Sequence, residues 1–323
     1  MSETACLFVL GSFVVACSAK VAHLPQAGES LRAEAFTVEA GGKGFNLALG
    51  ARRLGASVDG LLAIGNDFFS QLAEPALIQA DLQPAMLRRY EATTGSGVGF
   101  TDETGENCLA VYQGANQLLS AEDVRYSSEK LKASEIVLAQ FEISDEPILE
   151  AFTLARQAGS RTLLNPSPYR RLDPRILEHT SILVVNRVEA VQLQDACKLS
   201  ARMHTESSLL DRFAPLANVL LDRGPDIVVV TLGSDGAVAY QRGGECLHQP
   251  AFAVRAVDSL GAGDAFTAGL AAELLQGRPF SECLMYAAAC GAITTQRLGV
   301  FDALPTRDEL ERFLVSRRQP VFP

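Results

Sequence analysis

The second half of the chain alternates short apolar runs with segments long enough to form helices. The stretch EPILEAFTLARQAG (146–159) is an amphipathic example of the helical segments. The apolar runs between such segments are EIVLAQ (135–140), RTLLNP (161–166), SILVVN (181–186) and DIVVVTLG (226–233). Strands read as almost continuously apolar when helices cover both faces of a parallel sheet. The pattern therefore predicts an α/β fold.

The first half contributes to the same layers and adds a second element. FNLALGARRLG (45–55) and FFSQLAEPALIQA (68–80) predict helices on either side of a strand at DGLLAIG (59–65). Residues 12–40 hold strand-like pieces without a helix, and residues 96–113 predict a hairpin that turns at DETGEN. We expect these two stretches to form a small antiparallel sheet that acts as a lid over the carboxyl ends of the strands.

The length and the charge limit the possible organisation and partners. At 323 residues the chain is long for one domain and short for two, so we predict a single α/β domain over residues 1–323. The 28 Lys+Arg against 38 Asp+Glu give a formal net charge of −10, and no run of Lys and Arg exceeds two residues. A protein of that charge repels a phosphate backbone, so we expect no nucleic acid partner.

Two further features predict a cytoplasmic protein without a membrane partner. The apolar stretch ACLFVLGSFVVAC (5–17) has no preceding Lys or Arg and is interrupted by Gly11 and Ser12, so it predicts a buried first strand rather than a signal peptide or a membrane span. The seven cysteines are scattered and form no Cys-x-x-Cys pair, which predicts reduced thiols in the core.

The segment DSLGAGDAFTAG (258–269) carries the clearest chemical signal. The surrounding residues predict a strand at FAVRAV (252–257), a turn of small residues and a helix that begins at about Ala262. Free N–H groups in such a turn and the helix dipole together favour negative charge, such as that of a transferring phosphoryl group. Asp264 would then accept the proton of an attacking hydroxyl.

Other interpretations of this segment are simpler. A glycine-rich turn with an Asp is often only a helix N-cap. A dinucleotide site requires G-x-G-x-x-G, and Phe266 stands at the third glycine position. The chain has no Walker A sequence, so phosphoryl transfer here would not use a P-loop.

Several segments together resemble the ribokinase family of carbohydrate kinases, also called PfkB kinases. The resembling segments, in family order, are GGKGFNLALGARRLGA (41–56), DETGEN (102–107), GAN (114–116), QFE (140–142), LNPSP (164–168), NRVE (186–189), TLGSDG (231–236) and DSLGAGDAF (258–266). The resemblance implies a ribokinase-like three-layer sandwich with a mainly parallel central sheet and a small β-sheet lid. It also implies ATP-dependent phosphorylation of a hydroxymethyl group on a sugar or sugar-like molecule, with Mg²⁺.

The same resemblance implies roles for individual residues. Asp264 would be the catalytic base, and the N–H groups of Gly261, Ala262 and Gly263 would hold the transferring phosphate. Substrate hydroxyls would contact Gly42, Lys43, Asn46 and Glu142. Asn186 and Glu189 would position Mg²⁺ and phosphates through water, and Thr231 and Gly233 would hold the nucleotide phosphates. Taken singly, Lys43 is typical of a solvated surface charge, NRVE of a capped helix start, and TLGSDG of a strand followed by a turn.

A monovalent cation is a further implication of the resemblance. Family members often use a K⁺-like ion to shape the turn at residues 261–263, which we call the anion turn. Here Asp258 and Gly299 fall in the two segments that would hold the ion. Ala303 stands where the most similar members carry a serine, which puts K⁺ dependence in question.

The main departure from the family pattern lies after the first strand. In ribokinases the corresponding segment is similar to Gly-Ser-x-x-x-Asp, and its Asp binds two sugar hydroxyls. This chain has Ala16 in place of that Asp. Three hypotheses follow: a kinase for another sugar, a sugar derivative or a nucleoside; a ribokinase whose pocket is compensated by Glu142, Asn46 and a substituted contact; or a non-catalytic protein that binds a metabolite. We also expect a homodimer through the exposed lid edge, and surface positions for Arg170 and Arg171.

Overall fold

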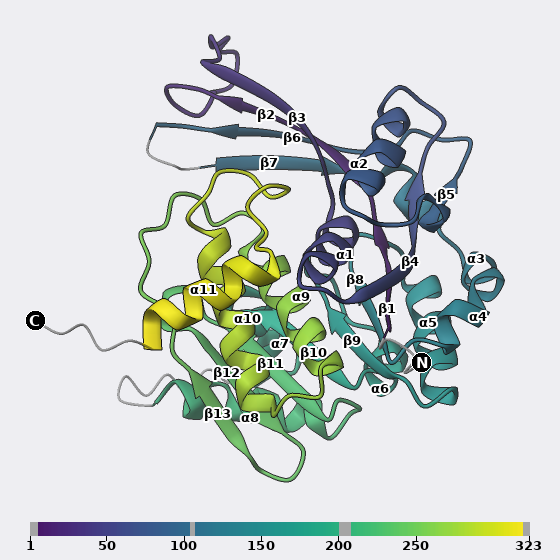
Figure 1. Ribbon diagram of the computed structural model, residues 1–323, viewed down its shortest axis with the longest axis vertical. Coiled ribbons are helices and arrows are strands. Elements are labelled where there is room, and N and C mark those ends of the chain that lie inside the picture. The colour runs from purple at the N-terminus through teal and green to yellow at the C-terminus, as the bar shows by residue number, and fades with distance from the viewer. Residues whose placement is uncertain (1–5, 104–106, 200–207, 319–323) are drawn as a thin grey trace, which may run out of the picture.

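The computed structural model describes residues 6–103, 107–199 and 208–318. They form a large sheet with helices on both faces and a smaller sheet that projects beyond one end of it (Figure 1). The turn predicted at 102–107 lies partly outside the described residues, but the strands that flank it pair antiparallel, as the predicted hairpin requires.

The large sheet has nine strands in the order β13-β12-β11-β10-β9-β8-β1-β4-β5. Their bounds are β1 (Cys6–Ser12), β4 (Ser57–Ile64), β5 (Leu87–Arg89), β8 (Ile136–Gln140), β9 (Arg161–Asn165), β10 (Ile182–Asn186), β11 (Ile227–Thr231), β12 (Ala237–Gln241) and β13 (Cys246–Gln249). All neighbours from β5 to β11 are parallel, and β12 and β13 join antiparallel at one edge. The predicted mainly parallel sheet is confirmed.

Helices cover both faces of this sheet and give it a separate core on each side. The first core packs against α1 (Lys43–Arg53), α2 (Ala73–Gln79), α9 (Ala262–Leu275), α10 (Phe280–Thr294) and α11 (Arg307–Arg318). The second packs against α3 (Ala121–Tyr126), α4 (Ser128–Lys132), α5 (Asp145–Gln157), α6 (Pro174–Glu178), α7 (Arg187–Ala196) and α8 (Leu209–Leu221). In β1, Leu7 and Val9 face the first core while Phe8 and Leu10 face the second, because strand side chains alternate. The three-layer α/β sandwich is therefore confirmed.

The small sheet differs in one respect from the prediction. Its four strands, in the order β3-β2-β6-β7, are β2 (Val14–Lys20), β3 (Ala35–Gly41), β6 (Gly95–Thr101) and β7 (Asn107–Tyr112). The outer pairs are antiparallel, but β2 and β6 are parallel, so the predicted wholly antiparallel sheet is wrong at its centre. The reason is that both strands enter the small sheet from the large one, β2 directly after β1 and β6 soon after β5.

The strand predicted at 252–257 does not form. β13 ends at Gln249, and Pro250, which has no N–H to donate to a ladder, follows it. Beyond this point the chain leaves the sheet, and the N–H groups of Val257 and Asp258 donate instead to the carbonyl of Thr295, at 2.7 and 3.1 Å. The turn before α9 is therefore attached to the end of α10 rather than to a strand.

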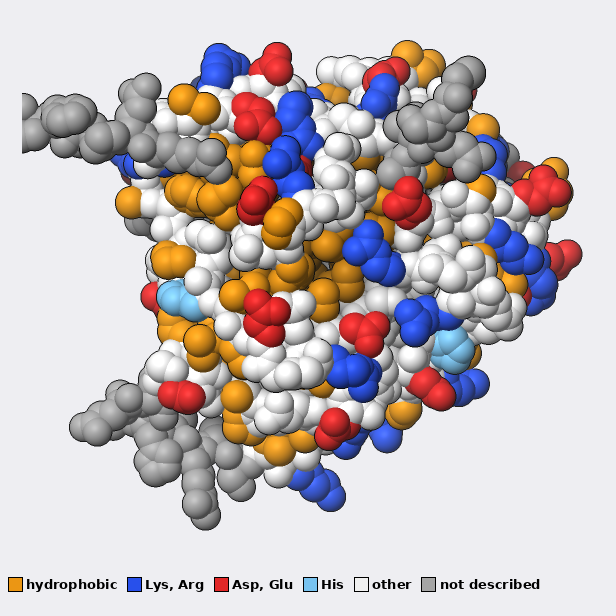
Figure 2. Space-filling view, turned by 60° about the horizontal axis from the view of Figure 1, so that its bottom comes forward, with side chains coloured by type: hydrophobic (Ala, Val, Ile, Leu, Met, Phe, Trp, Pro, Cys, Tyr) orange, Lys and Arg blue, Asp and Glu red, His pale blue; other side chains and the backbone are white. Residues whose placement is uncertain are grey.

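The cysteines are less buried than predicted. All seven are free, but only Cys283 and Cys290 lie in the core, whereas Cys108 and Cys246 are exposed. The core position is wrong for the other five because Cys6 begins β1, Cys17 and Cys108 lie in the small sheet, Cys246 begins the edge strand β13, and Cys197 caps the end of α7. Of the helices described, none combines the length and apolar character that crossing a membrane requires. On the face shown in Figure 2, acidic and basic side chains are interspersed rather than gathered by sign.

Candidate active site

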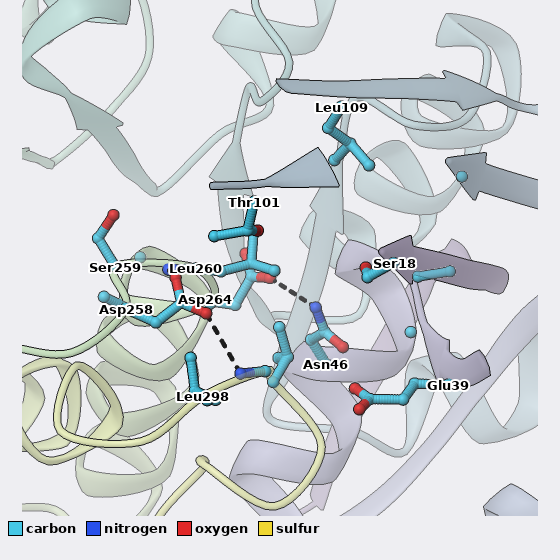
Figure 3. A pocket seen from close by; sticks show the side chains of 18 of the residues that line it. Ser18, Glu39, Asn46, Thr101, Leu109, Asp258, Ser259, Leu260, Asp264 and Leu298 are labelled. Atoms are coloured by element: carbon cyan, nitrogen blue, oxygen red, sulfur yellow. Dashed lines mark hydrogen bonds between the residues drawn. The ribbon is translucent and has the colours of Figure 1, made fainter. Parts of the chain in front are cut away.

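A large cavity lies between the small sheet and the carboxyl ends of the large sheet. Its volume is about 1170 Å³, more than a typical single-ligand pocket, so it has room for two small molecules. One wall comes from the inner face of the small sheet, and the other from the ends of β10 and β11, the first turn of α1 and residues 257–264 and 298–300. Figure 3 shows Asp264 beside Asp258 and Leu260, with Ser18 and Glu39 of the small sheet on the other side of the view.

Asp264 lies buried at the centre of this cavity, in the first turn of α9. Asn46 Nδ2 donates a hydrogen bond of 2.8 Å to Asp264 Oδ2, and Lys43 Nζ lies 3.4 Å from Asp264 Oδ1. Gly261 is the N-cap of α9, and the Asp264 side chain makes no capping bond to the helix. The interpretation of Asp264 as a mere cap is therefore wrong, and its carboxylate is held in place by α1.

The turn before Asp264 presents backbone donors to the cavity. Gly261 has φ +75°, and a Cβ there would lie 2.8 Å from Val300 Cγ1, so only glycine fits. Ala262 N already donates to the Ser259 carbonyl at 3.3 Å. Among the described residues, the N–H groups of Gly261 and Gly263 meet no acceptor.

Lys43 begins α1 and faces the cavity, with its side chain 26% exposed. Burial lowers the pKa of its ammonium, but the carboxylates of Asp264, Glu142 and Glu189 outweigh that effect and leave the pKa raised. Lys43 is therefore held in its charged form within the site. Its interpretation as a solvated surface charge is wrong.

Glu142 follows β8 and is anchored to the start of α1. Its Oε2 accepts hydrogen bonds from Ser12 Oγ at 2.6 Å and from the Lys43 backbone N–H at 2.9 Å. Gly44 brings α1 this close, because a Cβ there would lie 2.3 Å from Ser12 N. With Oε2 occupied in this way, Oε1 is the atom that Glu142 can offer to a substrate.

Ser12 and Gln140 also hold Glu142 and the start of α1 together, and neither was predicted individually as a site residue. The fully buried Ser12 Oγ also accepts a hydrogen bond of 2.9 Å from Gln140 Nε2 and one of 3.2 Å from Gly44 N. A serine at the end of an almost uninterrupted apolar strand was the available signal for Ser12, because a buried hydroxyl requires partners.

Asn186 and Glu189 form a capping box at the start of α7. Asn186 N donates to Glu189 Oε2 at 2.8 Å, and Glu189 N donates to Asn186 Oδ1 at 2.9 Å. The simple interpretation of NRVE as a capped helix start is thus correct. Asn186 also lines the cavity, and Glu189, 4% exposed, lies close enough to influence the pKa of Lys43.

Thr231 and Gly233 follow the neighbouring strand. Thr231 pairs with Asn186 in the ladder between β11 and β10, and both Thr231 and Gly233 line the cavity. Gly233 has φ +63°. The turn is supported from the side by Arg187, which donates to the Leu232 carbonyl at 2.9 Å and pairs with Asp235. These residues bring the predicted nucleotide contacts to one edge of the sheet, as parallel strands require.

Asp258 joins the anion turn to the loop at Gly299. Its Oδ1 accepts the Leu260 N–H at 2.9 Å, and its Oδ2 accepts the Gly299 N–H at 3.2 Å. Ala303 is fully buried and supplies no side-chain oxygen. In the part of the chain that the structure describes, no group of three or more His, Cys, Asp or Glu side chains could hold a metal ion. A divalent ion would therefore need oxygens from water and phosphates as well as from the protein.

Comparisons with known proteins place sugar kinases among the similar sequences. Mouse ribokinase is 32% identical over 313 residues, which cover 95% of this chain and 94% of the relative. A deoxyribokinase of Salmonella typhi is 29% identical over 309 residues, 95% of this chain and 97% of the relative.

Solved structures show the same fold. A ribokinase of Thermotoga maritima superposes with a TM-score of 0.84 at 28% identity, over 97% of this chain and 100% of that one. Arabidopsis thaliana ribokinase, solved in complex with ribose and ATP, gives 0.85 at 26% identity, over 97% of this chain and 99% of that one. The family model described as pfkB family carbohydrate kinase matches residues 5–307. The chain therefore belongs to the pfkB family of carbohydrate kinases.

Proposed function

We propose that this kinase transfers the γ-phosphoryl group of ATP to a hydroxymethyl oxygen of a sugar or sugar-like molecule, with Asp264 as the general base. The observation that carries the proposal is the position of Asp264. Its buried carboxylate lies in the first turn of α9, next to the free N–H groups of Gly261 and Gly263. A base and an anion site on one helix turn are what an in-line phosphoryl transfer needs.

In this mechanism each group in the cavity has a separate task. Asp264 takes the proton of the attacking hydroxyl as the oxygen approaches phosphorus. Lys43 and the anion turn stabilise the charge that develops on the transferring group, and Asn46 keeps the Asp264 carboxylate oriented through its 2.8 Å hydrogen bond. Glu142 Oε1 and the Lys43–Asn46 turn hold the substrate hydroxyls.

The nucleotide side of the proposal rests on the ends of β10 and β11. Asn186, Thr231 and Gly233 line the cavity beside the anion turn, where the phosphates of ATP would lie. The oxygen donors present fit Mg²⁺ bound through water, with Glu189 and Asn186 as its protein contacts, and Mg²⁺ would neutralise phosphate charge there. Closure of the small sheet over the substrate would exclude water.

The substrate is the open part of this proposal. Relatives named ribokinase and deoxyribokinase make pentoses the first candidates. Ala16, however, faces the cavity with a methyl group and cannot hold a pair of hydroxyls. We therefore favour a sugar or derivative other than free ribose; ribose held by Glu142 and Asn46 and a nucleoside are the alternatives.

The experiment is ADP release with ATP, Mg²⁺ and K⁺ against pentoses, deoxypentoses, hexoses, ketoses, amino sugars, sugar acids and nucleosides. We expect robust turnover of one class. Exclusive use of ribose would show that the pocket compensates for Ala16. Ligand-induced stabilisation without any turnover would overturn the kinase proposal and favour a metabolite-binding protein, although such a protein has no need of the base at Asp264.

A homodimer through the small sheet is a second proposal, and the outer face supports it better than the edge. Phe36, Val38, Val98 and Tyr112 lie on the face away from the cavity and are 64, 47, 54 and 63% exposed. Apolar side chains concentrated in this way are typical of a contact surface. In a two-fold symmetric dimer, the outer face of the small sheet in each copy would cover the same face of the other copy.

A further inference from the structure

Glu39 is the one charged side chain in the row that contains Ala16. Ala16 on β2 lies directly opposite Glu39 on β3 and Gly97 on β6. Residues directly opposite each other in neighbouring strands project from the same face, and all three line the cavity. Across this row the wall of the cavity therefore consists of the Glu39 carboxylate, the Ala16 methyl group, the bare backbone of Gly97 and the apolar side chain of Val111 on β7. Because Ala16 and Gly97 are small, a ligand can occupy the space beside the Glu39 carboxylate.

The Glu39 carboxylate is unpaired within the part of the chain that the structure describes. Among residues 6–103, 107–199 and 208–318, neither a hydrogen bond nor an ion pair reaches it. Partial burial, and then the negative charge of Asp302, raise the pKa of Glu39 above its ordinary value. A half-buried carboxylate in this position is stabilised by any donor that a ligand brings, because the described residues supply none.

The carboxylate reaches from the small sheet towards the opposite wall of the cavity. A Cβ placed on Gly299 would lie 3.2 Å from Glu39 Oε2 and 3.5 Å from Oε1. In Figure 3, Asn46 lies between Asp264 and Glu39. The two carboxylates therefore lie in different parts of the cavity, Asp264 in the first turn of α9 and Glu39 on the small sheet next to Gly299.

We propose that Glu39 is a specificity-determining residue, which accepts hydrogen bonds from hydroxyl or ammonium groups at the end of the sugar remote from the phosphorylated hydroxymethyl. The same carboxylate, with Asp302 behind it, repels sugars that carry a carboxylate or phosphate at that end. This assignment rests on the proposed sugar kinase activity. It narrows the substrate to neutral or amino sugars with donors at the remote end.

The experiment compares Glu39→Ala and Glu39→Gln with the wild type, using the best substrate of the sugar panel, its analogue deoxygenated at the remote end and the corresponding sugar acid. We expect Glu39→Ala to raise KM for the best substrate about 10- to 100-fold, the usual cost of losing a hydrogen bond to a charged group, while kcat changes little. The deoxygenated analogue should lose little with this variant, because it lacks the donor. Glu39→Gln should gain activity on the sugar acid.

Glu74 is an exposed glutamate on α2 outside the cavity, so Glu74→Gln is the matched control. An unchanged Tm shows that each variant is folded. An unchanged KM of folded Glu39→Ala for every sugar that the wild type uses would overturn the assignment. A wild type without turnover overturns the proposed function instead. The assignment is then decided by calorimetric binding of the same sugars, where equal Kd values for the wild type and Glu39→Ala count against it.

Discussion

Asn46 Nδ2 donates a hydrogen bond of 2.8 Å to Asp264 Oδ2 across 218 residues of sequence. The contact joins the first turn of α1 to the first turn of α9, and Lys43 adds a charged contact from the same turn of α1. Asp264 therefore points into the cavity with one oxygen restrained and the other beside a cation. A fixed carboxylate of this kind suits a base that must meet a hydroxyl in one direction.

Asp264→Asn should abolish most turnover while leaving the fold intact. An amide cannot take the proton, so we expect kcat to fall about 10²- to 10⁴-fold, with the Kd for ATP within about threefold of the wild type. ADP release and calorimetry measure the two effects, and Asp222→Asn on the exposed surface is the control. Wild-type turnover in folded Asp264→Asn would remove Asp264 from the chemistry.

Arg170 should be a positioning residue for Glu142. Its guanidinium lies 3.9 Å over the Phe141 ring and donates to the carbonyls of Phe141 at 2.5 Å and Ile143 at 2.8 Å, on either side of Glu142. The predicted surface position is thus wrong for Arg170 and correct for the exposed Arg171. A side chain that brackets Glu142 in this way fixes its backbone.

Arg170→Ala should raise the sugar KM about tenfold with a smaller change in kcat, because Glu142 loses its fixed backbone. Arg170→Lys should restore little of that loss, since one ammonium cannot replace a planar fork over the ring. Arg171→Ala is the matched control. Equal KM values for Arg170→Ala and Arg171→Ala would show that Arg170 is only structural.

Glu273 should contribute strongly to stability. It is fully buried in α9 and forms ion pairs of 2.6 Å with both Arg278 and Arg307. Glu273→Ala removes the buried anion and leaves the two half-buried guanidinium groups only more exposed carboxylates, Glu282 at 3.6 Å and Glu311 at 3.7 Å, so we expect the free energy of unfolding to fall by about 3 kcal/mol. Urea denaturation measures it. Glu282→Ala removes an exposed partner of Arg278 at 3.6 Å and should cost less than about 1 kcal/mol; equal losses would refute the buried network.

The anion turn should depend only weakly on K⁺. Asp258 already joins Leu260 to Gly299 through both of its oxygens, and Ala303 offers none. We expect replacement of K⁺ by Na⁺ to lower kcat/KM less than about tenfold, whereas Asp258→Ala should lower it more in either salt because the turn loses its tie. A larger response to K⁺ in the wild type would show that a bound cation, rather than Asp258 alone, shapes the turn.

The protein should be a dimer in solution. Light scattering should give twice the chain mass of 34.5 kDa, and Val98→Lys on the outer face of β6 should shift it towards the monomer. Val315→Lys, on the exposed side of α11, is the control and should leave the mass unchanged. A monomeric wild type would remove the dimer proposal.

Local patterns in the sequence were sufficient for the layers of the fold and for most of the cavity. Runs such as SILVVN predict buried parallel strands because a strand that is covered on both faces has consecutive apolar residues. The anion turn and the start of α9 were predicted from Gly261 and Asp264 for the same reason: small residues and a helix start are neighbours in the chain. The strand expected at 252–257 does not form because Pro250 follows the end of β13 and the N–H groups of Val257 and Asp258 donate to Thr295, a contact that no local pattern shows.

The sequence by itself determined the α/β class, the family and the identity of the residues at the anion turn, since each depends on short-range pattern and spacing. Only the tertiary structure decided which groups meet: Asn46 with Asp264, Ser12 with Glu142, Arg170 with Phe141, and Glu39 opposite Ala16. Those pairs depend on strand register and on the approach of α1 to β1, which distant segments set by packing together. No local pattern contains that information.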